Sequence, residues 1–328
     1  MTWWWWSRRR GRMTTARPAA RREVLVACVA IGALSLMAIS ADRAYRWGHP
    51  PTVHGLPAAK RPVVMAGIDY RTWTARVRPT LAGARCTAVF LEGFDLASFV
   101  SFREKMAPLQ VYALYLPGTD TVAIPLGPSR VPRHVLAHEL AHGILDQYVP
   151  TSWAAARTST LDATLAWRAL QEGIAEAASG PVTTREARYG ADYLSNVDAL
   201  LYEQAPLWAA TQSGPLLHAV TIGPRTTFEF LFPGVPLTDY AVVPDSAGAH
   251  ETITCSDELG ALAVFSAVRR RSGSTAWAVR AARAWRGDRA ERVNTLHGPY
   301  LRWRVRWGPE AGPLRAQWAT WFGHLPTA

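Results

Sequence analysis

The spacing of apolar and polar residues predicts a β-hairpin in the first half of the chain and one further strand near its end. Two short apolar runs, 109–115 and 121–126, flank the turn-forming residues 117–120. Residues 301–307 (LRWRVRW) alternate between apolar and arginine side chains. This alternation predicts a strand with one buried face and one solvated cationic face.

Helical periodicity predicts two helices directly after the hairpin. The first starts near Pro132, a favourable first-turn residue, and stops before Pro150. Ser159 or Thr160 caps the second, which continues to Gly180. Further helices are predicted at 193–210, 257–271 and 274–285, with an irregular Gly/Pro-rich stretch at 213–249.

The N-terminal region combines a basic tail with an uncharged segment. Residues 1–23 contain a cluster of arginines, and residues 24–41 contain no charged side chain. A helix of that length spans about 27 Å, close to the hydrocarbon core of a bilayer. We therefore expect a single-pass membrane anchor with a cytoplasmic N-terminus and an extracytoplasmic remainder. The alternative is a secreted protein whose signal is cleaved near residues 38–40.

The amino-acid composition indicates the class of protein and limits the partners that can be expected. The 328 residues are 49% hydrophobic and 19% charged, which is typical of a globular chain. Residues 42–62, rich in Pro, Arg and Ala, predict a linker to a single domain at 63–328. The formal charge is +11, but part of it lies in the N-terminal tail, so we expect no nucleic-acid partner.

The chain has three cysteines, and one of them, Cys28, lies in the uncharged N-terminal segment. Cys86 and Cys255 can form a disulfide if the domain is exported. Two unpaired buried thiols are the alternative, and the sequence leaves both interpretations open.

The segment HELAH places His138, Glu139 and His142 on the first of the two helices. Residues at i and i+4 project from one side of a helix, so the two imidazoles can share one tetrahedral Zn²⁺. Glu139 is rotated by about 100° from His138 and can reach a metal-bound water without being a ligand. The metal lowers the pKa of that water, and the carboxylate accepts its proton as hydroxide attacks a carbonyl. Core histidines that satisfy one another are the alternative.

A third ligand is expected from the second helix. Glu172 lies in its apolar segment ALQEGIAE, and an antiparallel return would bring this carboxylate over the histidines. Carboxylates on such a helix are costly to bury without a cation. Gly173 removes a side chain where the two helices approach. His134 and Asp146 are each one turn from a histidine of the motif, but three ligands along one helix fit a tetrahedron badly.

Two carboxylates are expected around the ligands rather than among them. One turn beyond the third ligand, Glu176 is expected to accept the free ring N–H of His138 or His142. Asp146, at i+4 from His142, is assigned the same outer position. Such hydrogen bonds fix the tautomer and the orientation of a ligand imidazole.

HELAH together with EGIAE resembles the gluzincin class of zinc metallopeptidases. Four segments within residues 111–289 also resemble, in the same order, an uncharacterised bacterial group of predicted metallopeptidases: HELAHGILDQY, DATLAWRALQEGIAE, DELGALAVFSAVRR and AARAWRGDR. The resemblance implies that His138, His142 and Glu172 are the ligands and that Glu139 is the base. Residues 213–249 depart from the pattern of this group.

The gluzincin resemblance carries two further expectations, an edge strand and an oxyanion donor, and the segment 285–289 adds a third. Residues 121–126 would form an edge strand that pairs with an extended peptide. In segment 285–289 (WRGDR), Asp288 and Arg289 are expected to have a structural role, by capping or pairing. A Tyr or His would stabilise the oxyanion. The candidates for that role are His218, Tyr240, His297 and Tyr300.

Together these features predict an α+β, zincin-like fold. A small mixed sheet packs on the HExxH helix and the Glu-bearing helix, and the C-terminal half is largely helical. The predicted function is a membrane-anchored, extracytoplasmic zinc-dependent endopeptidase that acts on a peptide or protein substrate. The alternative is an exported, non-catalytic module with a structural or vestigial zinc site. A structural site needs no base and usually closes with a fourth protein ligand, which disfavours that alternative.

Overall fold

The structure is a computed structural model whose described part comprises residues 52–60, 62–68, 84–98, 101, 112–116, 118–125, 131–149, 159–182, 187–323 and 325–326. This part has a mixed α/β architecture with two small sheets. The predicted tail and membrane segment, 1–41, lie outside the described residues, as do residues 42–51 of the predicted linker. Within the described residues, no helix is long and apolar enough to cross a membrane.

The predicted hairpin belongs to a three-stranded sheet with the order β1-β3-β2. β2 (Leu114–Leu116) and β3 (Thr121–Pro125) are antiparallel, whereas β1 (Val63–Ile68) pairs in parallel with β3. The hairpin is confirmed, although β2 is shorter than the predicted run 109–115. The prediction that 121–126 forms an edge strand is wrong, because β1 occupies its other side. Three consecutive residues of β3 are buried, a pattern typical of a central strand.

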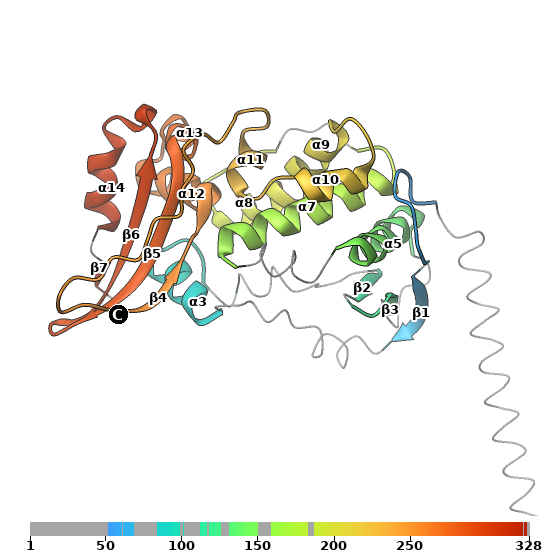
Figure 1. Cartoon of the computed structure of the whole chain (residues 1–328), viewed down its shortest axis with the longest axis horizontal. Coiled ribbons are helices and arrows are strands. Elements are labelled where there is room, and N and C mark those ends of the chain that lie inside the picture. The colour runs from blue at the N-terminus through green and yellow to red at the C-terminus, as the bar shows by residue number, and fades with distance from the viewer. Residues whose placement is uncertain are drawn as a thin grey trace, which may run out of the picture. The chain divides into compact units, whose positions relative to one another are not determined.

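The two predicted helices after the hairpin are confirmed as α5 (Arg133–Tyr148) and α7 (Leu161–Ser179). α5 begins directly after Pro132. The Thr160 hydroxyl caps α7 by accepting a hydrogen bond from the Ala163 N–H at 3.1 Å. α5 packs between the first sheet and α7 (Figure 1).

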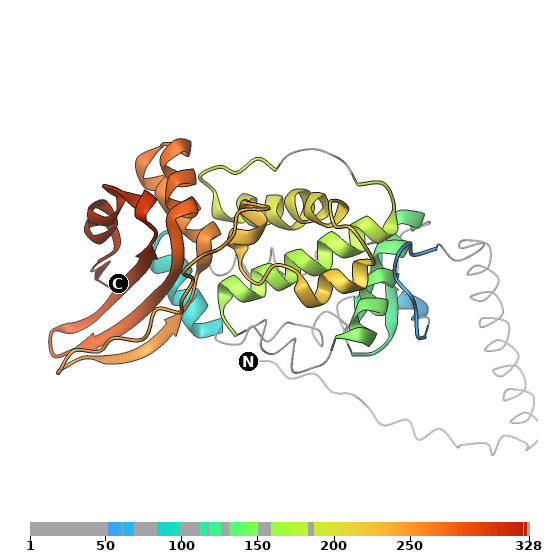
Figure 2. The ribbon, with the colours of Figure 1, turned by 45° about the horizontal axis from the view of Figure 1, so that its top comes forward.

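A group of short helices continues the chain, and most of them pack against α7, as the yellow ribbons of Figure 2 show. The helical prediction for 193–210 is confirmed, with one π-helical turn inside it. The prediction that 213–249 is irregular is wrong for its first half, where a capping box of Thr226 and Glu229 starts a helix. The group comprises α8 (Tyr193–Ala199), the π-helical turn η1 (Leu200–Gln204), α9 (Ala205–Ala210), α10 (Leu216–Ile222) and α11 (Thr227–Leu231).

Two glycines allow close packing around the central helices. A Cβ atom at Gly173 of α7 would lie 2.4 Å from the carbonyl oxygen of Ala205 in α9. The prediction that Gly173 admits α5 is therefore wrong, since its close neighbour is α9. In α5, a Cβ atom at Gly143 would lie 2.5 Å from Pro62 and 2.9 Å from the ring of Tyr115. Gly143 thus lets the chain around the first sheet approach α5.

The C-terminal part contains a second sheet with the order β4-β5-β6-β7, in which all neighbours are antiparallel. The prediction of a largely helical C-terminal half is therefore only partly right, because two long strands lie among its helices. The elements of this part are β4 (Thr252–Asp257), α12 (Gly260–Ser272), α13 (Thr275–Ala284), β5 (Trp285–Thr295), β6 (Gly298–Trp307), the short 3₁₀ turn η2 (Pro309–Ala311), α14 (Leu314–Phe322) and β7 (Leu325–Pro326). The earlier helix α3 (Ala84–Gly93) packs against β4 and β5.

The alternating segment 301–307 lies in β6, with Leu301 and Trp303 in the core. On its other face Arg306 is exposed as the alternation predicts, but Arg302 and Arg304 are partly covered. Glu291 of β5 is fully buried and accepts hydrogen bonds from Arg302 Nε and Arg304 Nη2, each at 2.8 Å. Both arginines also donate to carbonyl oxygens of the extended chain at 244–246. These partners, distant in sequence, neutralise the arginines and cover them.

The predicted structural role of the WRGDR segment is supported by the contacts of Asp288. This fully buried carboxylate accepts hydrogen bonds from the N–H groups of Leu259 and Gly260, where α12 begins. It also accepts from the indole N–H groups of Trp285 at 2.8 Å and Trp303 at 3.1 Å. Asp288 therefore joins α12 to the second sheet.

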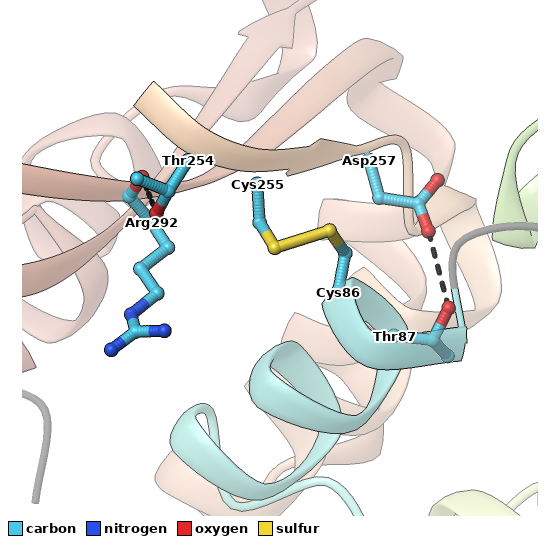
Figure 3. The surroundings of a disulfide bond; sticks show 6 residues. All are labelled: Cys86, Thr87, Thr254, Cys255, Asp257 and Arg292. Atoms are coloured by element: carbon cyan, nitrogen blue, oxygen red, sulfur yellow. Dashed lines mark hydrogen bonds between the residues drawn. A yellow bond between two sulfur atoms is a disulfide. The ribbon is translucent and has the colours of Figure 1, made fainter. Parts of the chain in front are cut away.

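A disulfide joins Cys86 of α3 to Cys255 of β4, with the two Cα atoms 5.3 Å apart (Figure 3). Beside it, the Thr87 hydroxyl donates a hydrogen bond to Asp257 at 3.5 Å. Of the two interpretations that the sequence left open for these cysteines, the structure has the disulfide. The bond fixes a helix from the first third of the chain to the C-terminal sheet.

Candidate metal centre

Three side chains from α5 and α7 converge on one point. His138 and His142 project from the same side of α5, and their Nε2 atoms are 3.0 Å apart. Glu172 extends from α7, and its Oε2 lies 3.1 Å from His138 Nε2 and 3.7 Å from His142 Nε2. This convergence depends on the packing of α5 against α7, because the carboxylate belongs to a different helix from the two histidines.

The spacing of these three atoms fits a tetrahedral metal ion. Zinc–nitrogen and zinc–oxygen bonds of about 2.0–2.1 Å place two tetrahedral ligands about 3.3 Å apart. The three observed separations, 3.0, 3.1 and 3.7 Å, lie on both sides of that value. Among the described residues, these three are the group whose ligand atoms meet closely enough to hold a metal. The donor set of two imidazoles and one carboxylate is also one that Zn²⁺ accepts.

Glu176 holds the ring of His138 from its other side. Its Oε2 lies 3.2 Å from His138 Nδ1, one turn of α7 beyond Glu172. A proton on Nδ1 completes this hydrogen bond and leaves the Nε2 lone pair facing Glu172 and His142. The structure therefore places Glu176 where the sequence predicts it.

The charges around the three side chains favour a cation. Burial disfavours the charged form of His138, but hydrogen bonds to Glu172 and Glu176 outweigh it and raise its pKa to about 10. Burial likewise opposes a charge on Glu172, yet the neighbouring His142 and the hydrogen bonds from both histidines hold the pKa of this carboxyl well below its usual range. The hydrogen bond from His138 also lowers the pKa of Glu176. Without a metal, a proton on His138 supplies the positive charge that this cluster attracts.

Glu139 lies beside the converging side chains without joining them. It is 8% exposed, and its Oε2 accepts a hydrogen bond from the Tyr115 N–H of β2 at 2.6 Å. Burial raises the pKa of Glu139, although the charges of His142 and His138 oppose this effect. The carboxylate is therefore fixed in place and has a raised affinity for a proton.

Asp146 does not contact the imidazoles, contrary to the outer position predicted for it. Its Oδ2 accepts hydrogen bonds from the Tyr115 hydroxyl and from the Gly118 N–H, both at 2.7 Å. Asp146 thus anchors the hairpin to α5. Its influence on the site is indirect, because it holds the same tyrosine whose backbone binds Glu139.

The other sequence candidates are not part of this cluster. His134 is exposed at the start of α5 and is absent from the converging group. His218 and His297 are exposed. The Tyr240 hydroxyl donates to the carboxylate of Glu258 at 3.0 and 3.1 Å, and the Tyr300 hydroxyl donates to Glu251 at 2.6 Å.

Tyr202 is a residue near the site that the sequence did not single out. It lies on the π-helical turn η1, which packs against α7. Surrounding protein raises the pKa of its phenol, and the carboxylates of Glu172 and Glu139 contribute to the rise. The sequence predicts only a helix over 193–210, and no pattern in it indicates the π-helical turn.

No known protein family, curated protein or solved structure matches the chain significantly. The chemistry of the site is therefore argued from its own geometry. Three ligand atoms that leave one coordination position free, with a buried carboxylate beside them, form an arrangement suited to metal-assisted hydrolysis.

Proposed function

We propose that the protein is a zinc-dependent peptidase whose metal is held by His138, His142 and Glu172, with Glu139 as the general base. The observation that carries this proposal is the convergence of two imidazoles and one carboxylate from separate helices beside a fourth, non-ligating carboxylate. A bound Zn²⁺ polarises a carbonyl and increases the acidity of water. The resemblance to gluzincins, with the zincin-like fold that it implies, agrees with this assignment.

The competing proposal is a structural or vestigial zinc site. A structural site usually closes with four protein ligands. In the described part of the chain, three groups converge and no fourth His, Cys, Asp or Glu joins them. Burying the Glu139 carboxylate also costs free energy, and a structural zinc site does not require it. Both points favour the catalytic proposal.

The residues around the ligands have separate roles in positioning and in proton transfer. Glu139 accepts a proton, and the Tyr115 N–H holds one of its oxygens so that the other is available. Glu176 fixes the tautomer of His138. Asp146 holds the Tyr115 side chain and so keeps β2 against α5.

A peptide substrate is supported by the position of β2. Within the described residues this strand pairs with β3 on one side only. Its residue Tyr115 directs its backbone N–H to Glu139 rather than to the sheet. An extended peptide that adds to such an edge by main-chain hydrogen bonds would therefore lie next to the proposed base. We thus assign to β2 the pairing with an extended peptide that was expected of residues 121–126.

We also propose that the domain is exported and remains anchored by residues 24–41. The Cys86–Cys255 disulfide supports export, because disulfides persist in oxidising compartments. The uncharged segment and its preceding arginines support an anchor with the N-terminus in the cytoplasm. Secretion after signal cleavage is the alternative.

Metal analysis and peptide cleavage on the full-length chain, purified in detergent, test the proposal. Wild type is expected to bind about one equivalent of zinc and to cleave peptides in a mixed library. Glu139→Gln is expected to retain zinc and to lose cleavage by at least about a hundredfold, because it removes the proton acceptor. Glu172→Ala is expected to lose zinc as well as activity.

Glu251→Gln is the matched control, because this carboxylate binds Tyr300 beside the second sheet rather than α5 or α7. It should leave both zinc content and cleavage unchanged. Unaltered cleavage by Glu139→Gln would reject the proposed mechanism, and a wild-type protein without bound zinc would reject the metal assignment.

A further inference from the structure

The chain just before β1 is bound to both helices of the candidate metal centre. Composition predicts a linker over 42–62, yet its described residues 54–60 and 62, here called the strap, lie against the domain (blue in Figure 1). At one end of the strap, the His54 N–H donates to the Ala178 carbonyl oxygen in the last turn of α7 at 3.0 Å. At the other end, Lys60 is bound by Gln147 in the last turn of α5. The strap therefore connects the two helices that supply the ligands.

The side-chain amide of Gln147 holds the strap backbone by two hydrogen bonds. Its Oε1 accepts from the Lys60 N–H at 3.1 Å, and its Nε2 donates to the Lys60 carbonyl oxygen at 2.5 Å. The same Nε2 lies 3.3 Å from Asp120 Oδ1, and the Lys60 ammonium lies 3.4 Å from Asp120 Oδ2. Paired contacts of this kind fix both the position and the direction of the strap where it meets α5.

Pro62 and Leu56 supply the apolar contacts of the strap. Pro62 is buried, and a Cβ atom at Gly143 of α5 would lie 2.5 Å from its ring. Gly143 directly follows the ligand His142, so this contact is made next to the metal centre. Leu56 is 7% exposed and belongs to the same apolar core as Ala175 of α7. Burial of apolar surface thus adds to the hydrogen bonds that hold the strap.

The strap is attached at opposite ends of the helix pair. α5 and α7 are antiparallel at the ligands, because His138 contacts Glu176 whereas His142, one turn later, contacts Glu172. Their last turns therefore lie at opposite ends of the pair, and a segment bound to both limits the sliding of one helix along the other. Such sliding would matter, since Zn²⁺ bonds are only about 2.0–2.2 Å long and a misplacement of about 1 Å loosens a site.

We propose that the strap is a positioning element of the metal centre, which fixes α5 relative to α7 and so keeps the three ligand atoms in reach of one Zn²⁺. This inference rests on the metal assignment of the proposed function. The strap acts through the two helices, because its contacts are with Ala178, with Gln147 and with the backbone at Gly143 rather than with the ligand side chains.

Zinc titration and thermal unfolding of two matched variants of the full-length chain test the inference. Leu56→Ala shortens a buried leucine of the strap, and Leu314→Ala shortens a buried leucine of α14, which packs against β6. Both should lower the thermal midpoint, because both remove apolar atoms from the core. Leu56→Ala should also weaken zinc binding at least tenfold, a loss typical of residues that orient metal ligands. Leu314→Ala should keep the wild-type affinity.

Two further variants test the same role. Leu56→Met keeps the apolar volume and should keep the zinc affinity of wild type. Gln147→Ala removes both hydrogen bonds to Lys60, so we expect metal binding to weaken about tenfold. With Co²⁺ in place of zinc, the visible absorption band depends on coordination geometry, and Gln147→Ala should change this band. Gln212→Ala, which removes an amide bound to the Trp208 carbonyl at the end of α9, should leave affinity and band unchanged.

The outcomes separate this inference from the peptidase proposal. Equal zinc affinity in wild type and Leu56→Ala, or equal losses in Leu56→Ala and Leu314→Ala, would overturn the positioning role and leave the peptidase function standing. Unaltered cleavage by Glu139→Gln, together with loss of zinc in Leu56→Ala, would reject the peptidase mechanism and support the strap. A wild-type protein without bound zinc would reject both.

Discussion

Glu258 is a carboxyl group in surroundings where a negative charge is unfavourable. It is 3% exposed and lies among other acidic side chains. Burial, together with the charges of Asp288 and Asp162, raises its pKa to about 9, although the hydrogen bond from Tyr240 and the charge of Arg289 act in the opposite direction. At neutral pH this side chain therefore keeps its proton in the folded protein.

Stability is expected to fall as pH rises, because of this residue. The folded pKa of Glu258, about 9, is above its unfolded value of about 4.5, so the unfolded chain releases the proton first. The stabilisation is complete below about pH 4.5 and is lost as pH rises to about 9. Glu258→Gln keeps the contact with Tyr240 and cannot ionise, so it should be more stable than wild type at pH 8 by up to about 5 kcal/mol.

Urea unfolding at pH 5, 7 and 8.5 measures this effect. The variant should show a flatter dependence of the unfolding free energy on pH than wild type. Glu251→Gln is the control and should keep the wild-type slope, because the lowered pKa of Glu251 keeps this carboxylate ionised above pH 5. A variant with the same slope as wild type would mean that Glu258 is ionised in the folded state.

At residue level, the sequence predicted the candidate metal-binding cluster because its signals are local. The spacing of His138 and His142 follows from helix geometry, and Glu172 stands out as a carboxylate on an apolar helix. The position predicted for Asp146 was wrong, because the sequence does not show that the hairpin supplies the hydrogen-bond donors to this carboxylate. Tyr202 was missed for a related reason: its position depends on a π-helical turn with no distinctive residue pattern.

At the scale of elements, the packing of α9 on α7 determines where Glu172 lies. Gly173 is the contact point, and Ala205 approaches it through its backbone. Backbone cannot move as a flexible side chain can, so an added methyl group must displace one helix. A displacement of α7 would also move the adjacent Glu172 relative to the histidines of α5.

We therefore expect Gly173→Ala to be destabilising despite the better helix propensity of alanine. The Cβ atom would lie 2.4 Å from the Ala205 carbonyl oxygen. Overpacking of this kind costs about 1–3 kcal/mol, more than the roughly 1 kcal/mol that alanine gains in a helix. Thermal unfolding should show a lower midpoint, and zinc titration a weaker affinity. Gly190→Ala, where no atom lies within 4 Å of the added Cβ, should change neither.

Helices and strands were predictable from the sequence where a single spacing of apolar residues dominated the segment. α5 and α7 have clear ends, and the hairpin has clear turn residues. β5 was missed because WRGDRAERVNT is rich in charge and lacks alternation. Its buried carboxylates, Asp288 and Glu291, have partners from other elements, including arginines of β6 and the start of α12. Such pairing over long sequence distances leaves no periodic pattern along the strand itself.

At the scale of the whole molecule, the Cys86–Cys255 disulfide closes a loop between residues separated by 169 positions. A crosslink of this span restricts the unfolded chain strongly, and disulfides typically contribute about 2–4 kcal/mol. Its removal should therefore weaken the attachment of α3 to the second sheet before it affects the candidate metal-binding cluster, which lies on other elements.

The double variant Cys86→Ser, Cys255→Ser is expected to lose about 2–4 kcal/mol of unfolding free energy and to retain zinc. Urea unfolding with and without reductant measures the loss. Reductant should lower the stability of wild type to that of the variant and leave the variant unchanged. Equal stability of the oxidised wild type and the variant would mean that the crosslink contributes nothing measurable.

The position of α3 has a consequence for the order in which the protein is made. The ring of Phe94, the residue directly after α3, packs against Trp303 at 5.0 Å and against Phe322 at 6.0 Å, both from the last part of the chain. A nascent chain emerges N-terminus first, so this helix leaves the ribosome long before its partners exist. Its apolar face, with Phe90 and Leu91, stays uncovered in that interval and is a natural binding site for chaperones. Completion of the fold is therefore a late event in biogenesis, after β6 and α14 have been synthesised.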